Sequence, residues 1–575
     1  MRRLLLAAVA ATLAVPASAD AADPVLPLSE VQPGMRCTGL TVVRGLDITS
    51  FDVEVIDVVD RARGTSARII VRVSGPAVDA TGLGPGFSGS PIVCTGADGV
   101  ARNIGAISET IGEYGGRTAL ATPIEAILAQ PPQPPGATRS TIGTRSSTIG
   151  ARSSVIGARS LAGPLTIAGL RPSLARAFVR AARKAGRTLI AAPAGTGATF
   201  PPQPLVPGAS VSVGLTSGDI VLGAIGTVAY SDGSNVWIFG HELDAAGRRS
   251  LFLQDAFIHT VVSNPLAVPE VSTYKLGSPG NDLGTISSDG PTAVVGTLGA
   301  PPPSFPLRVT AKDLDSKRER SAVTQITDEG DVGLPTGGSP LSITAAAAVA
   351  EAAAGILDGA PARQTGELCI RATLRELRAP LRMCNSYAVD GASQNALAGA
   401  AAADVASAVE VLESFKFATL HPTAIELGLR VRRGLSQAFI LGATGPRAVR
   451  RGHTIRLRLR LRRTGSGATT TRTLRLRVPL TAPTGLRTLR LTGTPADGGS
   501  DPNQEGGDLS LIFEGDASGD DDSGPESLRE LRETFQSLAR YNGITARLGD
   551  EERRAFSDPR LRISGEARVR LRIRR

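Results

Sequence analysis

A serine set between glycines is the segment of this sequence with the clearest potential for chemistry. Ser88 lies within residues 84–91, which read GPGFSGSP, and an apolar run follows directly. A serine hydroxyl becomes a nucleophile when its backbone exposes it and a base removes its proton, and glycines permit the necessary bend. The N–H groups of Gly86 and Ser88 could then hold the oxyanion of an acyl intermediate. A tight turn ahead of a strand explains the same residues without any chemistry.

The chain contains four histidines that could act as the base for Ser88. His241 follows a predicted strand and a glycine, a loop position from which an imidazole can point into a cleft. His259 lies in an apolar strand and is interpreted as structural. His421 and His453 are also interpreted as structural, because one precedes a proline in a connection and the other lies in an Arg/Leu-rich strand. The local sequence therefore favours His241 as the general base.

Length and composition indicate a mostly β protein of several domains. The length of 575 residues predicts roughly three or four domains. Aromatic residues make up only 3% of the chain, so its cores must consist of Val, Leu, Ile and Ala, and 66 glycines and 39 prolines favour short strands joined by turns. No His/Cys cluster has zinc spacing, so we expect no metal site; we expect no cofactor and no nucleic-acid partner either.

Residues 1–19 have the three parts of a signal peptide. A basic start at Arg2 and Arg3 precedes an apolar segment, and small residues at 17–19 form a cleavage site. No later segment reaches the roughly 18 apolar residues that a membrane span requires, and the nearest, 344–357, contains Glu351. We therefore expect a protein that is secreted or associated with the cell wall and has no transmembrane anchor.

Export allows the four cysteines to form disulfides. Cys369 and Cys384 flank a predicted hairpin, and Cys37 and Cys94 both lie in the N-terminal β region. We therefore predict the pairs Cys37–Cys94 and Cys369–Cys384.

The first half of the chain alternates between β regions and connecting segments. Residues 20–130 contain short strands such as 51–56, where apolar and acidic residues alternate. Residues 131–162 form a Pro-rich linker with a seven-residue repeat, and one apolar residue per heptad cannot form a coiled-coil seam. A surface-binding role for this basic repeat is the alternative to a plain linker. A short helical segment (163–204), in which 172–186 is the helix, then leads to further strands at 205–315.

The second half begins with an α/β segment at 316–415, and a β-sandwich follows at 416–498. Within the sandwich, Leu457, Leu459 and Leu461 share one strand face and arginines share the other. This arginine face is either simply solvated or binds an anionic cell-wall polymer. An acidic flexible linker (499–526) and a helix with a basic β tail (527–575) end the chain, and we expect the tail to pair with a sheet. The helix opens on a capping box at Ser527 and Glu530.

Several of these segments share motifs with one known family of peptidases. They are residues 39–45, 51–56, 85–92, 104–107, 239–241, 258–262, 275–279 and 284–286. Together they resemble the stage IV sporulation protein B family of serine peptidases, over roughly residues 31–130 and 205–312. The resemblance implies a chymotrypsin-like double β-barrel domain, assembled here from the two sequence segments 20–130 and 205–315.

The resemblance also implies roles for individual residues. Ser88 matches the nucleophile and His241 the general base, although the family places the His-containing half first and this chain places it second. A triad is defined by geometry and not by chain order. At the position of the family's acidic residue this chain has Ser74 and Gly75, so Asp79 and Asp244 are the nearest candidates for an orienting acid.

Two functions fit these observations. The first is an exported serine endopeptidase, or a self-processing peptidase, that acts on a protein or peptide substrate. The second is a non-catalytic envelope-binding protein that retains a degenerate peptidase fold as a scaffold. The unmatched acid favours the second, whereas Ser88, His241 and the glycine loop favour the first.

Overall fold

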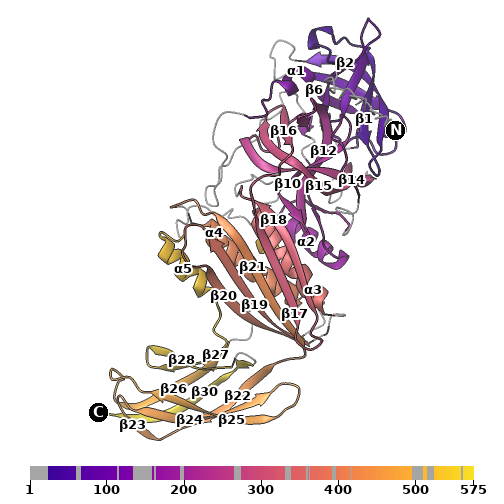
Figure 1. The fold of residues 1–575 in the computed structure, drawn as a ribbon. Coiled ribbons are helices and arrows are strands. Elements are labelled where there is room, and N and C mark those ends of the chain that lie inside the picture. Colours follow the sequence, from indigo (N-terminus) through magenta and orange to yellow (C-terminus); the bar gives the residue numbers. More distant parts are fainter. Residues whose placement is uncertain are drawn as a thin grey trace, which may run out of the picture.

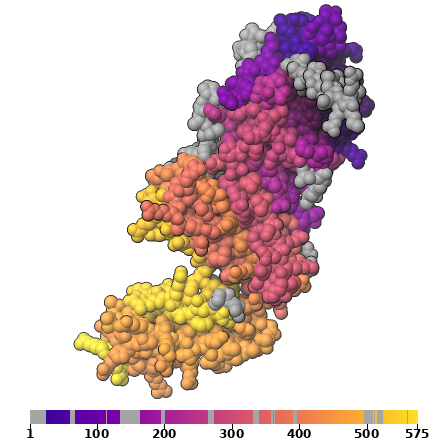
Figure 2. Space-filling view, viewed as in Figure 1, coloured from indigo at the N-terminus to yellow at the C-terminus, as the bar shows by residue number. Residues whose placement is uncertain are grey.

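The computed structural model describes most of the chain. The described residues are 24–59, 67–112, 115–133, 158–160, 163–193, 200–263, 273–329, 339–357, 361, 363–390, 396–415, 417–494, 509–513, 524–558 and 561–575. The predictions for the signal peptide, for the heptad repeat and for most of the acidic linker concern residues outside these ranges. Figure 1 shows four units that follow one another in chain order along an elongated molecule, and Figure 2 shows the same succession in space-filling form.

The first unit is a closed barrel of six antiparallel strands. Its strands are β1 (Arg36–Val42), β2 (Ile48–Val59), β3 (Arg68–Ser74), β4 (Pro91–Thr95), β5 (Ala101–Ile111) and β6 (Thr118–Pro123). They pair in the order β1-β2-β3-β6-β5-β4, and the β4–β1 pairing closes the first ring. Phe51, Val53 and Val55 point into its core while Asp52 is exposed, so the predicted alternation of this strand is confirmed. The short elements η1 (Leu28–Glu30), α1 (Ile124–Leu128) and β7 (Ala158–Ser160) flank the barrel.

The second unit repeats this strand order with a different sequence. Its strands are β10 (Ser210–Gly214), β12 (Val221–Ser231), β13 (Asn235–Ile238), β14 (Gly247–Ser263), β15 (Thr273–Gly290) and β16 (Ala293–Leu298). They pair in the order β10-β12-β13-β16-β15-β14, and β14 pairs with β10, which completes a second ring of pairings. Numbered from its own first strand, each ring therefore runs 1-2-3-6-5-4.

A small crossover extends the second ring at β12. Strand β8 (Leu165–Ala168) pairs with β12, helix α2 (Pro172–Lys184) follows, and β9 (Leu189–Ala191) returns parallel to β8. The helix ends just before Gly186, whose φ is +70°, and a positive φ is adopted most readily by glycine. The helix predicted at 172–186 is thereby confirmed.

The third unit is a six-stranded sheet with two packed helices. Its elements are β11 (Thr216–Gly218), β17 (Ser304–Asp313), β18 (Glu319–Thr327), α3 (Pro340–Ile356), β19 (Arg363–Leu374), β20 (Leu381–Asp390), α4 (Ala396–Glu413) and β21 (Pro422–Arg433). The two helices are the α part of the α/β segment predicted at 316–415, and both are rich in buried alanine. The sheet order is β11-β18-β17-β21-β19-β20. Strand β21 lies in the range assigned to the sandwich from its alternating sequence, yet it is central here, because the same alternation suits a strand of either sheet.

The fourth unit is a sandwich of two sheets around one apolar core, and its last four strands lie beyond the range 416–498 for which the sequence predicts a β-sandwich. Its strands are β22 (Gln437–Thr444), β23 (Ala448–Arg450), β24 (Thr454–Arg463), β25 (Thr469–Arg477), β26 (Gly485–Gly493), β27 (Gly543–Leu548), β28 (Glu551–Ser557), β29 (Arg562–Ser564) and β30 (Glu566–Arg574). The leucines of β24 are buried and its arginines are exposed. The basic tail does pair with the sandwich, through β29 with β22 and β30 with β26.

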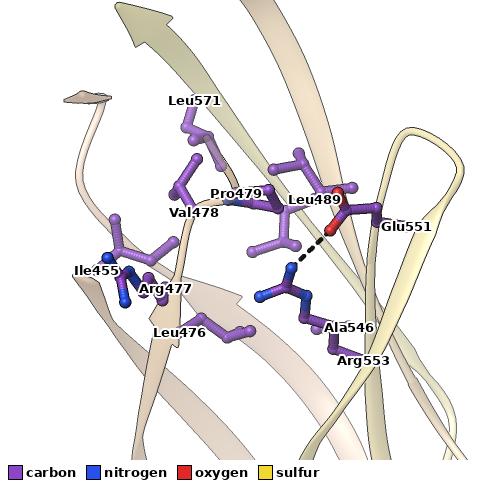
Figure 3. Close-up of a pocket in the computed structure, with 11 residues that line it drawn as sticks. Ile455, Leu476, Arg477, Val478, Pro479, Leu489, Ala546, Glu551, Arg553 and Leu571 are labelled. Atoms are coloured by element: carbon purple, nitrogen blue, oxygen red, sulfur yellow. Dashed lines mark hydrogen bonds and ion pairs between the residues drawn. The ribbon is translucent and has the colours of Figure 1, made fainter. Parts of the chain in front are cut away.

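Figure 3 shows a cavity between these two sheets, with the hydrogen bond from Arg553 to Glu551 (2.8 Å) at its edge. Its volume is about 20 Å³, which is room for about one water molecule. The cavity is therefore a packing gap and not a ligand site.

Two further elements lie in the chain between β26 and β27 and pack against the second and third units. Helix α5 (Leu528–Ser537) begins at Ser527, whose hydroxyl accepts a hydrogen bond from the Glu530 N–H at 3.2 Å, so the predicted N-cap is confirmed. A short turn, η3 (Leu509–Ile512), packs against α2 and α4. In the described part of the chain, no helix has both the length and the apolar composition of a membrane span.

Both predicted disulfides are present. Cys37–Cys94 joins β1 to β4, the pair of strands that closes the first ring. Cys369–Cys384 joins β19 to β20. Each bond links residues directly opposite one another in neighbouring strands, so each reinforces a pairing that the backbone already makes.

Candidate functional site

Ser88 and His241 occupy equivalent places in the two rings. Ser88 lies in the connection from β3 to β4, the third and fourth strands of the first ring. His241 lies in the connection from β13 to β14, the third and fourth strands of the second ring. The shared strand order therefore presents the serine and the histidine on corresponding loops.

These two loops meet at the junction of the rings. The Gly89 N–H donates to the Ile107 carbonyl at 2.8 Å, and a Cβ built on Gly240 would lie 3.5 Å from that same oxygen. The Thr122 hydroxyl donates to the Gly240 carbonyl at 2.6 Å, and the Thr227 N–H donates to the Ser88 carbonyl at 2.9 Å. The residue after Ser88 and the residue before His241 thus flank one carbonyl group.

The glycines of the serine loop are required by the close approach of the second ring. A Cβ on Gly84 would collide with the Thr273 carbonyl, and one on Gly89 with the Thr227 carbonyl. A Cβ on Gly86 would lie 2.8 Å from the Cβ of Lys275, closer than real side chains come. These positions accept no side chain, and the whole loop, residues 82–90, is buried.

Ser88 is buried, with 1% of its surface exposed, yet its loop retains free hydrogen-bond donors. Within the described residues, the N–H groups of Gly86 and Ser88 donate to no acceptor. Buried backbone donors without a partner are rare because they cost free energy. The two N–H groups that the sequence assigned to an oxyanion hole therefore make no hydrogen bond to another described residue.

His241 is held in the tautomer that a general base requires. Its Nδ1 lies 2.6 Å from the Glu242 carbonyl oxygen, and since a carbonyl only accepts, Nδ1 carries the proton. Its Nε2 is buried and has no hydrogen-bond partner among the described residues. No hydrogen bond joins it to Ser88 in that part of the chain. The ring stacks on Phe239, with 5.4 Å between ring centroids.

Burial lowers the pKa of His241 to about 4, despite opposing contributions from the Glu242 hydrogen bond and from the charge of Glu109. The side chain is 3% exposed, and a buried imidazole avoids carrying charge. At neutral pH the ring is neutral, so the lone pair of Nε2 is available to accept a proton.

Glu109 is a carboxylate near His241 that sequence reasoning missed. It lies on β5, is 4% exposed, and accepts a hydrogen bond from the Arg68 Nε at 2.9 Å. Its second oxygen, Oε2, has no partner among the described residues. A single acidic residue within the apolar run of β5 is the feature of the sequence that could have indicated it.

Neither acid predicted from the sequence is bound to the imidazole. Asp79 pairs with Arg117 at 3.2 Å on the surface. Asp244 forms an ion pair with Arg249, whose side chain is fully buried and also pairs with Glu329 at 2.6 Å. Asp244 therefore stabilises the loop that carries His241 and does not orient its ring.

Asp289 also holds the His241 loop. Its carboxylate accepts hydrogen bonds from the N–H groups of Leu243 (2.8 Å) and Asp244 (3.0 Å), and it lies 3.7 Å from Arg249. Burial raises the pKa of Asp289 to about 8, and the nearby Asp244 contributes to this rise. The network of Asp244, Asp289, Glu329 and Arg249 fastens the loop to β14, to β15 and to the end of β18.

Lys275 is a second ionisable group that sequence reasoning missed. It is 2% exposed and donates to the Thr41 hydroxyl at 2.6 Å and to the Thr227 hydroxyl at 3.1 Å. Its Nζ lies 4.7 Å from the centroid of the Phe87 ring, and burial lowers its pKa to about 7. The Thr227 hydroxyl donates in turn to the Gly86 carbonyl at 2.9 Å. Lys275 thus connects both rings to the serine loop.

The remaining histidines have partners that fit structural roles. His259 Nε2 lies 2.9 Å from the Ser278 hydroxyl, and His421 Nδ1 lies 2.7 Å from a Glu376 carboxylate oxygen. His453 Nδ1 lies 3.1 Å from the Arg451 carbonyl oxygen. In the described part of the chain, no group of three His, Cys, Asp or Glu side chains is arranged to hold a metal ion.

Comparisons with models of protein families, with curated proteins and with solved structures found no match to this chain. Its function therefore has to be argued from the chemistry of the junction. That junction combines a serine, an uncharged imidazole and two backbone N–H donors, and among the described residues neither the imidazole Nε2 nor these donors have a hydrogen-bond partner.

Proposed function

We propose that this chain is an exported serine endopeptidase or self-processing peptidase, with Ser88 as nucleophile and His241 as general base. The observation that carries this proposal is the state of His241 beside the serine loop: it is buried, neutral and protonated on Nδ1, and its Nε2 has no hydrogen-bond partner among the described residues. The resemblance to the stage IV sporulation protein B family points to the same pair. Two rings of identical strand order support a chymotrypsin-like double β-barrel, and two disulfides support export.

The reaction follows from these groups. The Ser88 hydroxyl transfers its proton to Nε2 of His241 as its oxygen attacks a peptide carbonyl. The Gly86 and Ser88 N–H groups stabilise the resulting oxyanion. His241 then gives the proton to the leaving amine, and water hydrolyses the acyl-enzyme by the same route. The negative charge of Glu109 favours the imidazolium form that exists in between, since it raises the pKa of His241.

Access to Ser88 is the structural condition for this reaction. The residue is only 1% exposed, and the second ring covers its loop through Thr227, Lys275 and Thr273. A substrate peptide can reach the hydroxyl only when the rings separate around this loop. A peptidase built in this way is latent in the closed form, which fits a self-processing protein better than a constitutively open one.

A fluorophosphonate probe, which reacts with activated serines, tests the proposal. We expect a covalent adduct that maps to Ser88 and is lost in Ser88→Ala and in His241→Ala. His259→Ala is the matched control, because it removes a partly buried histidine of the same ring, and it should retain labelling. An adduct on another serine, or none under any condition in which the protein stays folded, would contradict the assignment.

A non-catalytic envelope-binding protein is the second candidate. It is favoured by the missing hydrogen bond between Ser88 and His241 among the described residues and by the exposed arginines of β24. Four of these, at positions 456, 458, 460 and 462, project from one face of the strand, and such a face attracts an anionic polymer. Co-sedimentation with cell-wall teichoic acid at low and high salt tests this role, because screening should release the protein.

A further inference from the structure

One face of the fourth unit carries five arginines without a counter-charge. Alternation in β24 buries its leucines and exposes Arg456, Arg458, Arg460 and Arg462. On β25, Arg475 is exposed and lies directly opposite Arg456. Among the described residues, these five side chains, which we call the arginine face, have no hydrogen bond and no ion pair. Like charges directly opposite one another destabilise a sheet, so an external anion would stabilise this one.

The sequence around the arginine face contains no acidic residue. Residues 427–496, which include all of β22, β24 and β25, contain no Asp or Glu. The other sheet of the sandwich differs, because Glu566 lies 3.5 Å from Arg490 and Glu552 pairs with Arg547 at 2.5 Å. One sheet therefore neutralises part of its own charge, whereas the other leaves its arginines to an external partner.

Two large apolar side chains lie beside these arginines. Phe439 lies directly opposite Arg462 in the pairing of β22 with β24, and 46% of its surface is exposed. Leu441, which is 47% exposed, lies at the irregularity of β22 beside Gly442, the residue that pairs with Arg460. Exposed apolar surface is unfavourable in water. The face therefore suits a partner that offers an apolar phase as well as negative charge.

The position of the arginine face suits contact with an extended surface. Figure 1 shows β24 and β25 in the fourth unit, at the opposite end of the molecule from the first unit. Successive arginines of β24 are about 6.7 Å apart, so they form a row along most of this strand of 10 residues. A molecule that rests on this row would hold its first two units away from the surface.

We propose that the arginine face, together with Phe439 and Leu441, docks on an anionic phospholipid bilayer. Guanidinium groups pair with phosphate oxygens in a bidentate way, and arginines close to an anionic leaflet strengthen binding to it. Phe and Leu side chains enter the boundary between headgroups and acyl chains. An anionic polymer in water would neutralise the arginines but leave the two apolar side chains in water. The inference rests on the arginine face of the envelope-binding candidate, gives that candidate a partner, and is independent of the chemistry proposed for Ser88.

Co-sedimentation of the full chain with vesicles tests this surface. Vesicles of equal parts of phosphatidylglycerol and phosphatidylcholine should bind the protein at least about 30-fold more tightly than vesicles of phosphatidylcholine alone. High salt should reduce that difference, because it screens the charges. Equal binding to the two kinds of vesicle would overturn the proposal. Binding of soluble teichoic acid without binding of either vesicle would also overturn it and would leave a polymer as the partner, whereas binding of none of them would contradict the envelope-binding candidate as well.

A pair of charge variants locates the binding. Arg458→Gln/Arg460→Gln removes two charges from the arginine face and should weaken binding to the anionic vesicles by about 30-fold. Arg490→Gln/Arg547→Gln is the matched control, because it removes two exposed charges from the other sheet, and it should bind as the wild type does. An unchanged affinity in the first variant, or an equal loss in the control, would place the contact elsewhere.

A second pair of variants separates a bilayer from a polymer. Phe439→Ser/Leu441→Ser should weaken binding to the anionic vesicles by about tenfold and leave binding of soluble teichoic acid unchanged. Phe439→Trp adds an exposed reporter, since the one tryptophan of the chain, Trp237, is buried. Its emission should shift to shorter wavelength on the anionic vesicles, whereas that of the wild type should not. Undiminished binding of the serine variant, or an unshifted emission from Phe439→Trp bound to vesicles, would overturn insertion into a bilayer.

Discussion

The two rings share one strand order but fix their equivalent loops in different ways. In the first ring, the serine loop is held by backbone packing, at glycines where the second ring leaves no space for a Cβ. In the second ring, the His241 loop is held by charge, through Arg249 and three carboxylates. Strand order therefore determines where each loop lies, whereas the local contacts of each loop, backbone packing in one and ion pairs in the other, determine how firmly it is held. A substitution can remove either kind of contact without touching the other.

The largest effect is expected from Gly89→Ala. A Cβ there would collide with the Thr227 carbonyl and lie 2.7 Å from the Phe239 nitrogen, at a φ of +89°. We expect a loss of about 4 kcal/mol or more in the free energy of unfolding, measured in urea. Gly34→Ala is the matched control, since φ is +86° in open space, and it should lose only about 1–2 kcal/mol. Equal losses would show that backbone strain, and not contact between the rings, explains the glycine.

Arg249→Met tests the charged loop. It leaves the carboxylates of Asp244, Asp289 and Glu329 buried without their cation, so we expect a loss of about 3 kcal/mol at pH 8. The positive charge of Arg249 lowers the pKa of Asp289, which burial otherwise raises, so the folded variant binds more protons than the folded wild type. The loss should therefore shrink as the pH falls toward 5. Arg248→Met, at an exposed neighbour, should cost about 0.5 kcal/mol or less; a similar loss there would contradict the ion network.

Lys275→Met tests the contact between the two rings, which Lys275 bridges through the hydroxyls of Thr41 and Thr227. The pKa of Lys275 is lowered from 10.5 to about 7, so between these values the unfolded chain holds a proton that the folded chain has released. Its contribution to stability therefore rises by about 1.4 kcal/mol per pH unit from pH 7 to 10 and is constant below 7. The difference between wild type and variant should show that slope in urea unfolding. Lys312→Met, at a surface lysine paired with Glu319, should change the free energy of unfolding by at most about 1 kcal/mol.

The smallest effect is expected from Asp79→Asn. Asp79 pairs with Arg117 on the surface, and exposed pairs contribute about 0–1 kcal/mol. Neither stability nor fluorophosphonate labelling should change measurably. Glu109→Gln is the informative contrast, because it removes the charge that raises the pKa of His241 and should slow labelling. A slower reaction in Asp79→Asn alone would restore Asp79 as the orienting acid.

Much of the fold follows from local sequence. Alternation predicted strand 51–56 and the leucine face of β24, and glycine and capping residues predicted α2 and α5. A predicted hairpin indicated Cys369–Cys384, and a shared N-terminal β region indicated Cys37–Cys94. The sheet to which β21 belongs could not be predicted. Alternation shows that a strand has one buried face, but it does not show which sheet the strand joins.

Only part of the candidate site could be predicted from the sequence. Ser88 and His241 stand in recognisable loops, but Glu109, Lys275 and Arg249 acquire their roles from contacts between segments far apart in the chain. The alternation within a strand indicated one of them, because Arg249 shares the buried face of β14 with Leu251. It did not indicate Lys275, which shares its face of β15 with Thr273 and Gly277, while Leu276 has the other parity. A charged residue on the apolar parity of a strand marks a buried partner, although its identity requires the fold.

The pH dependence of labelling at Ser88 tests the central claim most directly. If the buried imidazole of His241 is the base, the rate of adduct formation follows its neutral fraction and falls to half near pH 4, because burial lowers its pKa to about 4. Circular dichroism over the same range establishes where the protein stays folded. A half-point near 6.5, the ordinary value of a histidine, or a profile that His241→Ala leaves unchanged, would contradict the account.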